Sequence, residues 1–251
     1  MPYGNTLLVV DPAVVINPSI HASLPYDWHR DLKPVSTLTA SPLVLTVPAA
    51  SPARDVNGLI ALARASPRRS RAGNEGAQAL SFASAGVGTT PHMAGELFKL
   101  RIDADMVHVP YKGSGPAMAD LVAGRVSMAF STLTAALPFI RDGRLRALAT
   151  SGDRRAAVLP DVPTVAEAGV PGFEVKFWTA LFVARDTPDP FVARLNAEAR
   201  RALGHPELRA ALERVSEAAA GSTVDEAEAF VAAEHAKWAA VVRDAHVTAA
   251  P

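Results

Sequence analysis

Apolar runs of strand length alternate with helix-forming segments over most of the chain, and this alternation constrains the fold more than any other feature. Strands that alternate with helices build a parallel, doubly wound sheet. The predicted strands are 7–10, 43–47, 80–84, 106–109, 126–130, 145–149 and 177–183, and the predicted helices are 55–65, 133–141 and two that open at Pro91 and Pro116. From Pro190 onward the pattern is almost wholly helical, with breaks near 204–206 and 221–222. The sequence therefore predicts an α/β protein with a helical C-terminal part.

Some local signals refine this outline. The polar, glycine-containing segment 68–78 is predicted to be a loop. Thr164 and Glu167 have the spacing of a capping box before a short helix that Gly169 would close. The last helix is expected to carry Ala229, Phe230, Ala233, Trp238 and Val241 on one side and to expose Glu234 and His235 to solvent.

Composition excludes several classes of function. The 251 residues are 49% apolar, and 25 Lys and Arg balance 25 Asp and Glu. A formal charge of zero gives no electrostatic reason to expect a nucleic acid or an anionic membrane surface as partner. The absence of cysteine excludes disulfides and thiolate metal sites. No apolar run approaches the roughly 20 residues that a membrane span needs, so we expect no direct membrane insertion.

Several predicted strand–helix turns carry glycine or hydroxyl residues just before a helix. These turns are 84–90, 113–115 and 131–132. Each offers free backbone N–H groups and the positive end of a helix dipole, which together can hold a carboxylate or phosphate. Such turns gather at the carboxyl ends of parallel strands, so they predict an anion-binding site, although glycine and serine are also ordinary in turns of this kind. Gly86 and Gly88 do not begin a dinucleotide fingerprint, because Pro91 stands at the third glycine position.

Catalytic and metal-binding patterns are weak. The sequence has neither Gly-x-Ser-x-Gly nor Ser-x-x-Lys. His92 and Glu96 lie four residues apart on one helix, a spacing that suits a shared metal but more often a surface pair, and no third ligand is near. Phe177 and Trp178 are adjacent in a strand, so at most one of them is expected to face a ligand. We therefore predict no catalytic residues, no metal site and no cofactor.

Extended stretches of the sequence resemble one protein family. They are HVPYKGSGPAMADLVAGRV at 108–126, GRLRALA at 143–149 and LPDVPTVAEAG at 159–169, supported by INP at 16–18, LPYD at 24–27, SAGVGT at 84–89, AGELF at 94–98 and LNAE at 195–198. This combination resembles the receptors of tripartite tricarboxylate transporters, also called the Bordetella uptake gene (Bug) family. The resemblance extends from about Thr6 to Val242.

The resemblance implies a two-domain, Venus-flytrap fold of the type II periplasmic-binding class. Domain one would comprise residues 1–106 plus 181–251 and domain two residues 107–180, with hinges near 106–111 and 173–182. Closure of the two domains would bury a small carboxylate. Carried over by position, the carboxylate loop would be Ser84, Gly86, Gly88, Thr89 and Thr90, and further pocket-lining residues would be Tyr111, Ser131 and Trp178.

The function that the resemblance implies is that of an extracytoplasmic solute receptor rather than an enzyme. It would bind a dicarboxylate, an aromatic acid or an amino acid, act as a periplasmic monomer, and deliver its ligand to the membrane subunits of a transporter. Alternatives remain open: a solute-sensing adaptor for a signalling receptor, a truncated relic without function, or a small enzyme that uses His92 or His108.

The sequence departs from the family pattern at its start. The family's export signal and its first strand, loop and helix have no counterpart before Tyr3, so we expect an N-terminally truncated chain without a signal peptide. Asp11 stands where the family has a loop of small residues. If Asp11 faces the ligand, its charge disfavours a bare carboxylate and favours an amino acid or another ligand with a cationic group.

Overall fold

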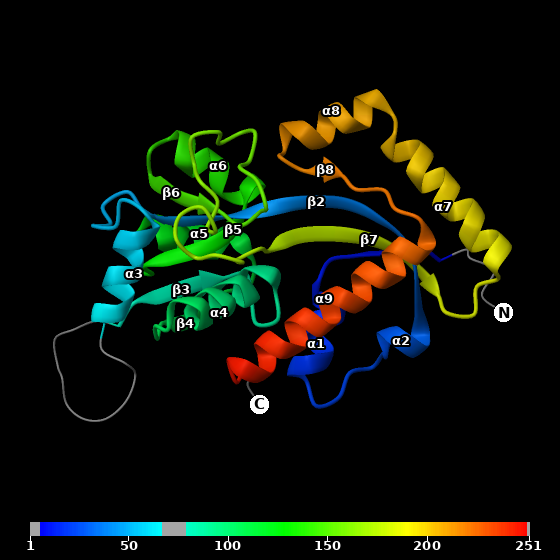
Figure 1. Cartoon of the computed structure of the whole chain (residues 1–251), viewed down its shortest axis with the longest axis horizontal. Helices are drawn as coiled ribbons and strands as arrows, with labels where there is room; N and C mark the ends of the chain where they lie inside the picture. Colours follow the sequence, from blue (N-terminus) through cyan, green and yellow to red (C-terminus); the bar gives the residue numbers. More distant parts are fainter. Residues whose placement is uncertain (1–5, 67–78, 250–251) are drawn as a thin grey trace. The chain divides into compact units, whose positions relative to one another are not determined.

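The computed structural model describes residues 6–66 and 79–249, and the chain divides into two units (Figure 1). Unit 1 comprises the residues up to Ser41 together with those from Phe177 onward, and unit 2 comprises Pro42–Lys176. The chain passes from unit 1 into unit 2 within strand β2 (Leu32–Pro48) and returns at the start of β7 (Lys176–Ala184). The loop predicted at 68–78 lies outside the described residues.

These units differ from the predicted domains at one boundary. Strand β3 (Ser81–Ser84) pairs in parallel with β4 (Val107–Pro110), so a boundary at 106 would separate two neighbouring strands of one sheet. Residues 42–106, which were expected in domain one, therefore belong with the segment that follows them. The second predicted boundary, at 180, falls close to the observed passage between Lys176 and Phe177.

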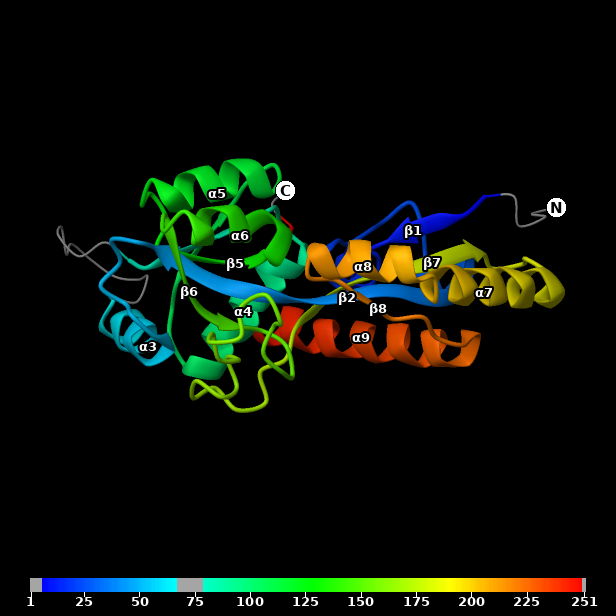
Figure 2. The same cartoon turned by 90° about the horizontal axis from the view of Figure 1, so that it is seen from above.

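Unit 2 is a mixed α/β sheet with helices on both faces. β3 pairs in parallel with β4 and with β5 (Met128–Thr132), while the second half of β2 runs antiparallel to β5 and β6 (Leu145–Thr150). Figure 2 shows α5 (Ser114–Val122) and α6 (Leu133–Arg141) on one side of these strands, and α3 (Val56–Ala65) and α4 (Thr90–Ile102) on the other. The prediction of an α/β fold is confirmed, but the sheet is mixed rather than wholly parallel, because β2 runs antiparallel to β5 and β6.

The strands of unit 2 are apolar because both faces are covered. Phe82, Ala83, Ala129 and Phe130 are at most 1% exposed. Helix α4 approaches β3 so closely that a Cβ atom on Gly95 would lie 2.3 Å from the ring of Phe82. Glycine is therefore needed at this position, where the second turn of α4 packs against Phe82 of β3.

Unit 1 is built from the two ends of the chain. β7 lies between β1 (Leu8–Val10) and the first half of β2, which also pairs with the short β8 (Ala218–Ala219). The helices are α1 (Ala13–Ile20), α2 (Trp28–Asp31), α7 (Asp189–Leu203), α8 (Pro206–Arg214) and α9 (Val224–Asp244). The helical C-terminal part with its breaks is confirmed. Helices α1 and α2 were not predicted: Pro12 and Pro18 interrupt the pattern at α1, and α2 has only 4 residues.

The buried face of α9 differs from the predicted one. Ala227, Val231, Glu234 and Trp238 are buried, whereas Ala229 and Ala233 are exposed. Glu234, which was expected in solvent, is 9% exposed because it lies on the same helical face as Val231 and Trp238. Its carboxylate accepts hydrogen bonds from the indole N–H groups of Trp178 and Trp238, each at 3.0 Å, and from Lys237 at 2.9 Å.

The predicted capping box at Thr164 forms without the expected helix. Glu167 N–H donates to the Thr164 hydroxyl at 3.0 Å, and Thr164 N–H donates to the Glu167 carboxylate at 2.9 Å. The chain completes a turn and leaves it at Gly169, whose φ is +108°.

Among the described residues, no helix is both long and apolar enough to cross a membrane.

Candidate functional site

The parallel strands of unit 2 end at a common edge. β3 ends at Ser84, β4 at Pro110 and β5 at Thr132, and each is followed by the start of a helix: α4, α5 or α6. Tyr111 N–H donates to Ser84 O at 3.0 Å, and Gly113 N–H donates to Ala85 O at 3.0 Å. These bonds hold neighbouring turns together, so positive helix ends gather at one edge of the sheet.

The Ser84–Thr90 loop depends on glycine. Gly86 has a φ of +142° and Gly88 a φ of +77°, which other residues rarely adopt. The Thr89 hydroxyl donates to Gly86 O at 2.8 Å, which closes the turn before α4.

Thr90 is the residue whose environment most suggests a ligand. It is the first residue of α4 and is 2% exposed, yet its hydroxyl oxygen has no hydrogen-bond partner among residues 6–66 and 79–249. A buried hydroxyl is nearly always paired, so an unpaired one needs an explanation. The first-turn N–H groups of α4 also lack partners inside the helix. An anion at this helix start would satisfy both.

Ser84 makes several contacts within the loop. Its hydroxyl oxygen accepts from Gly86 N–H at 3.1 Å, lies 3.1 Å from Gly86 O and lies 2.6 Å from Nε2 of His108. These contacts hold the shape of the loop.

Two other predicted residues lie near this edge. Ser131 is buried in β5, and its hydroxyl makes a weak contact of 3.6 Å with the sulfur of Met118, so it can still bond to a ligand. The Tyr111 hydroxyl donates to Asp120 at 2.8 Å. Burial and this hydrogen bond raise the pKa of Tyr111 to about 12, so its hydroxyl stays protonated and neutral.

His92 and Glu96 form a buried group rather than a surface pair. His92 is 3% and Glu96 5% exposed, and His92 Nε2 lies 3.8 Å from Glu96 Oε1. His92 Nδ1 accepts from Gly88 N–H at 3.2 Å, and its ring stacks on that of His108 at 3.8 Å between centroids. No cluster of three or more potential metal ligands occurs within the described part of the chain.

Asp11 and Trp178 belong to unit 1, whereas the residues above belong to unit 2. Asp11 accepts from Ala13 N–H at 2.9 Å at the start of α1, and it lines a largely apolar cavity of about 680 Å³. Trp178 does not line this cavity. It is 1% exposed and bonds to Glu234, whereas its neighbours Phe177 and Thr179 line the cavity, as the alternation of side chains along a strand requires.

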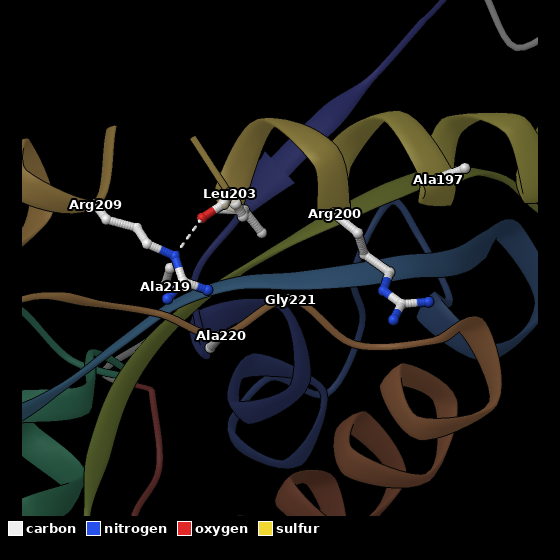
Figure 3. Close-up of a pocket in the computed structure, with 8 residues that line it drawn as sticks. Ala197, Arg200, Leu203, Arg209, Ala219, Ala220 and Gly221 are labelled. Atoms are coloured by element: carbon white, nitrogen blue, oxygen red, sulfur yellow. Dashed lines mark hydrogen bonds between the residues drawn. The ribbon is translucent and has the colours of Figure 1, made fainter. Parts of the chain in front are cut away.

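Sequence reasoning missed a basic cavity in unit 1, which Figure 3 shows. It measures about 500 Å³ and lies between α7, α8 and β8. Arg200 and Arg209 contribute its positive charge, and Arg209 Nε donates to Leu203 O at 3.0 Å. The two arginines are on different helices, so no sequence spacing pointed to them. Both are exposed, and Leu203 together with alanines and glycines forms the rest of the wall.

Known proteins resemble this chain over most of its length. The chain is 39% identical over 236 residues to the UPF0065 protein in the tcbD-tcbE intergenic region of Pseudomonas sp. (strain P51). The matched region covers 94% of this chain and 67% of that protein. The structure of R. palustris Rpa4515 with adipate has a TM-score of 0.86 and 31% identity, covering 98% of this chain and 79% of that one. MatC (Rpa3494) from Rhodopseudomonas palustris with bound malate has a TM-score of 0.78 and 31% identity, covering 96% of this chain and 80% of that one.

The family model described as "Tripartite tricarboxylate transporter family receptor" matches residues 1–247. Members of this family are periplasmic solute-binding receptors; the family is not a class of enzymes. The sequence match, the fold of both solved structures and the α/β architecture agree. The chain belongs to the tripartite tricarboxylate transporter family of receptors.

Proposed function

We propose that this chain binds a small carboxylate for a tripartite tricarboxylate transporter and that one carboxylate group of the ligand binds at the Ser84–Thr90 loop. The observation that supports this most is the buried hydroxyl of Thr90 at the start of α4, which has no hydrogen-bond partner among the residues that the structure describes. The loop itself contains no basic side chain. Binding there would rely on N–H groups, a hydroxyl and the helix dipole.

The similar proteins support the ligand class. Adipate and malate, found in two of the similar structures, are both small dicarboxylates. We propose that a dicarboxylate of this size is the ligand here, delivered to membrane subunits by a monomeric receptor that needs no cofactor. Ser131 and the start of α6 lie at the same edge of unit 2 and would supply further hydrogen bonds.

Isothermal titration calorimetry with adipate and malate tests this proposal. Thr90→Val removes the hydroxyl but keeps the shape of the side chain, so we expect binding to weaken about tenfold, the loss expected for one hydrogen bond to a charged group. Thr187→Val is a matched control, because the Thr187 hydroxyl is also buried and unpaired within the described ranges but belongs to unit 1.

The control separates binding from folding. Removing an unpaired buried hydroxyl should leave stability unchanged or raise it in both variants. Equal affinity in the parent, Thr90→Val and Thr187→Val would show that the ligand binds elsewhere. If the parent binds neither adipate nor malate nor any acid of a wider carboxylate panel, the proposed function is wrong.

A further inference from the structure

Two histidines lie directly beneath the Ser84–Thr90 loop. His92 is in the first turn of α4, and His108 is in β4 beside β3. Their rings stack at 3.8 Å between centroids with 20° between planes, and Phe82 stacks on His108 at 4.9 Å and 24°. His92 is only 3% exposed and His108 is partly buried, and their stack forms a base for the loop.

Each histidine holds a different end of the loop. Gly88 N–H donates to His92 Nδ1 at 3.2 Å, and the Ser84 hydroxyl lies 2.6 Å from His108 Nε2. A ring nitrogen that accepts a hydrogen bond carries no proton, so neutral His92 has its proton on Nε2, which faces Glu96. The hydrogen bond from Gly88 therefore requires one tautomer of His92.

The surroundings keep both rings neutral. Burial lowers the pKa of His92 to about 4 and that of His108 to about 3, and the positive charge of Lys99 acts in the same direction. The Lys99 ammonium pairs with Glu96 at 2.9 Å on the same helix. A proton on His92 Nδ1 would break the hydrogen bond from Gly88 N–H. A positive charge on either ring would also be repelled by Lys99.

We propose that His92 and His108 are positioning residues for carboxylate binding: as a neutral stacked pair, they hold Gly88 and Ser84 so that the start of α4 can receive the ligand. They act through the loop and do not touch the ligand. This inference rests on the proposed function of the Ser84–Thr90 loop, and it assigns to each histidine a particular nitrogen and a particular partner.

Paired substitutions test the assignment at His92. His92→Phe keeps an aromatic ring on His108 but removes the acceptor for Gly88 N–H. His92→Asn loses the ring but places an amide oxygen close to the position of Nδ1. With adipate and malate as probes, we expect His92→Phe to bind about five- to tenfold more weakly than the parent and His92→Asn to recover to within about threefold.

A second pair tests His108 in the same way. His108→Phe keeps the stack and loses the bond to Ser84, while the amide group of His108→Gln reaches the position of Nε2. We expect the same pattern, loss with phenylalanine and recovery with glutamine. Circular dichroism and thermal melting of each variant check that it folds, and a purely structural role would give no difference in affinity between folded variants.

Nitrogen-15 NMR of the histidine rings in the parent protein gives a readout that does not depend on any variant. We expect His92 to show an unprotonated Nδ1 and a protonated Nε2 at neutral pH, both without ligand and with adipate or malate. A protonated Nδ1 overturns the proposal, even if the phenylalanine variants do not fold.

The remaining outcomes are also decisive. If the folded phenylalanine variants bind the probes as the parent does, or if asparagine and glutamine fail to restore binding, the histidines do not position the loop, although the proposed function stands. If the parent itself binds no carboxylate, the proposed function fails and this inference fails with it.

Discussion

Replacement of Glu234 should strongly destabilise unit 1. The Glu234 carboxylate accepts hydrogen bonds from the buried indoles of Trp178 and Trp238 and from Lys237, and it thereby connects β7 to α9. In Glu234→Ala both indole N–H groups lose their acceptor. A buried donor without a partner costs about 1–3 kcal/mol, so the free energy of unfolding should fall by about 3 kcal/mol or more.

The assay for this prediction is thermal unfolding followed by tryptophan fluorescence. Trp28, Trp178 and Trp238 all belong to unit 1, so their emission reports on this unit. For a chain of this size about 3 kcal/mol corresponds to a fall in Tm of about 6–12 °C. Glu234→Gln keeps an oxygen that can accept from the indoles and loses only the ion pair, so it should cost about 1 kcal/mol.

Exposed Glu213 on α8 provides the control. Glu213→Ala should change the free energy of unfolding by no more than about 0.5 kcal/mol. A Tm of Glu234→Ala within about 2 °C of the parent would refute the reasoning, because it would mean that the two indoles find other acceptors at no cost.

Other predictions concern unit 2 and the ligand. Gly95→Ala should destabilise the protein by about 1–3 kcal/mol in a denaturant titration, since its Cβ atom would overlap the ring of Phe82; an unchanged midpoint would contradict this close packing. Because folded His92 and His108 have pKa values of about 4 and 3, below the ordinary 6.5, the unfolded state binds more protons below that pH, and stability should fall as pH drops from about 6.5 toward 4, by up to about 1.4 kcal/mol per pH unit for each ring. Glu96, whose pKa burial raises, opposes this in part; the slope should flatten in a His92→Asn, His108→Gln double variant, and an unchanged slope would exclude the pair as its source. Asp11→Asn should raise the affinity for malate measured by calorimetry if Asp11 acts on the ligand, whereas equal affinities would assign Asp11 to the start of α1 alone.

The sequence was sufficient to predict the α/β architecture, and it also indicated the edge of the sheet at which we propose that an anion binds. Both depend on local patterns: apolar runs followed by glycine or hydroxyl residues before a helix. Gly86 and Gly88 were predicted in the loop, and they have positive φ values that other residues rarely adopt. Thr90 was predicted to belong to the 84–90 turn and, from the resemblance, to the carboxylate loop, and the structure adds that its hydroxyl is buried without a partner in the described ranges.

What the sequence could not show are contacts between distant segments. Glu234 seemed exposed because no local pattern reveals the indole of Trp178, which comes from a strand far away in the chain. His92 and His108 were each considered alone, since only the pairing of β3 with β4 brings their rings together. For Trp178, adjacent strand residues face opposite sides, and sequence alone does not say which side is the core.

The predicted domain boundary at 106 differs from the observed division into units for a similar reason. A resemblance transfers the order of segments along the chain but does not show which strands pair. The parallel register of Ser81 with Val107 joins the segments before and after that boundary in one sheet. Division into units follows strand pairing, which becomes visible only in three dimensions.

Backbone NMR of the nitrogen-15-labelled protein during titration with adipate and malate tests the central claim most directly. We predict that the largest shifts of amide signals fall on Gly86, Thr89, Thr90 and His92 at the start of α4, while the signals of Arg200 and Arg209 in the basic cavity stay in place. Shifts that gather around Arg200 and Arg209 and spare the Ser84–Thr90 loop would contradict the account.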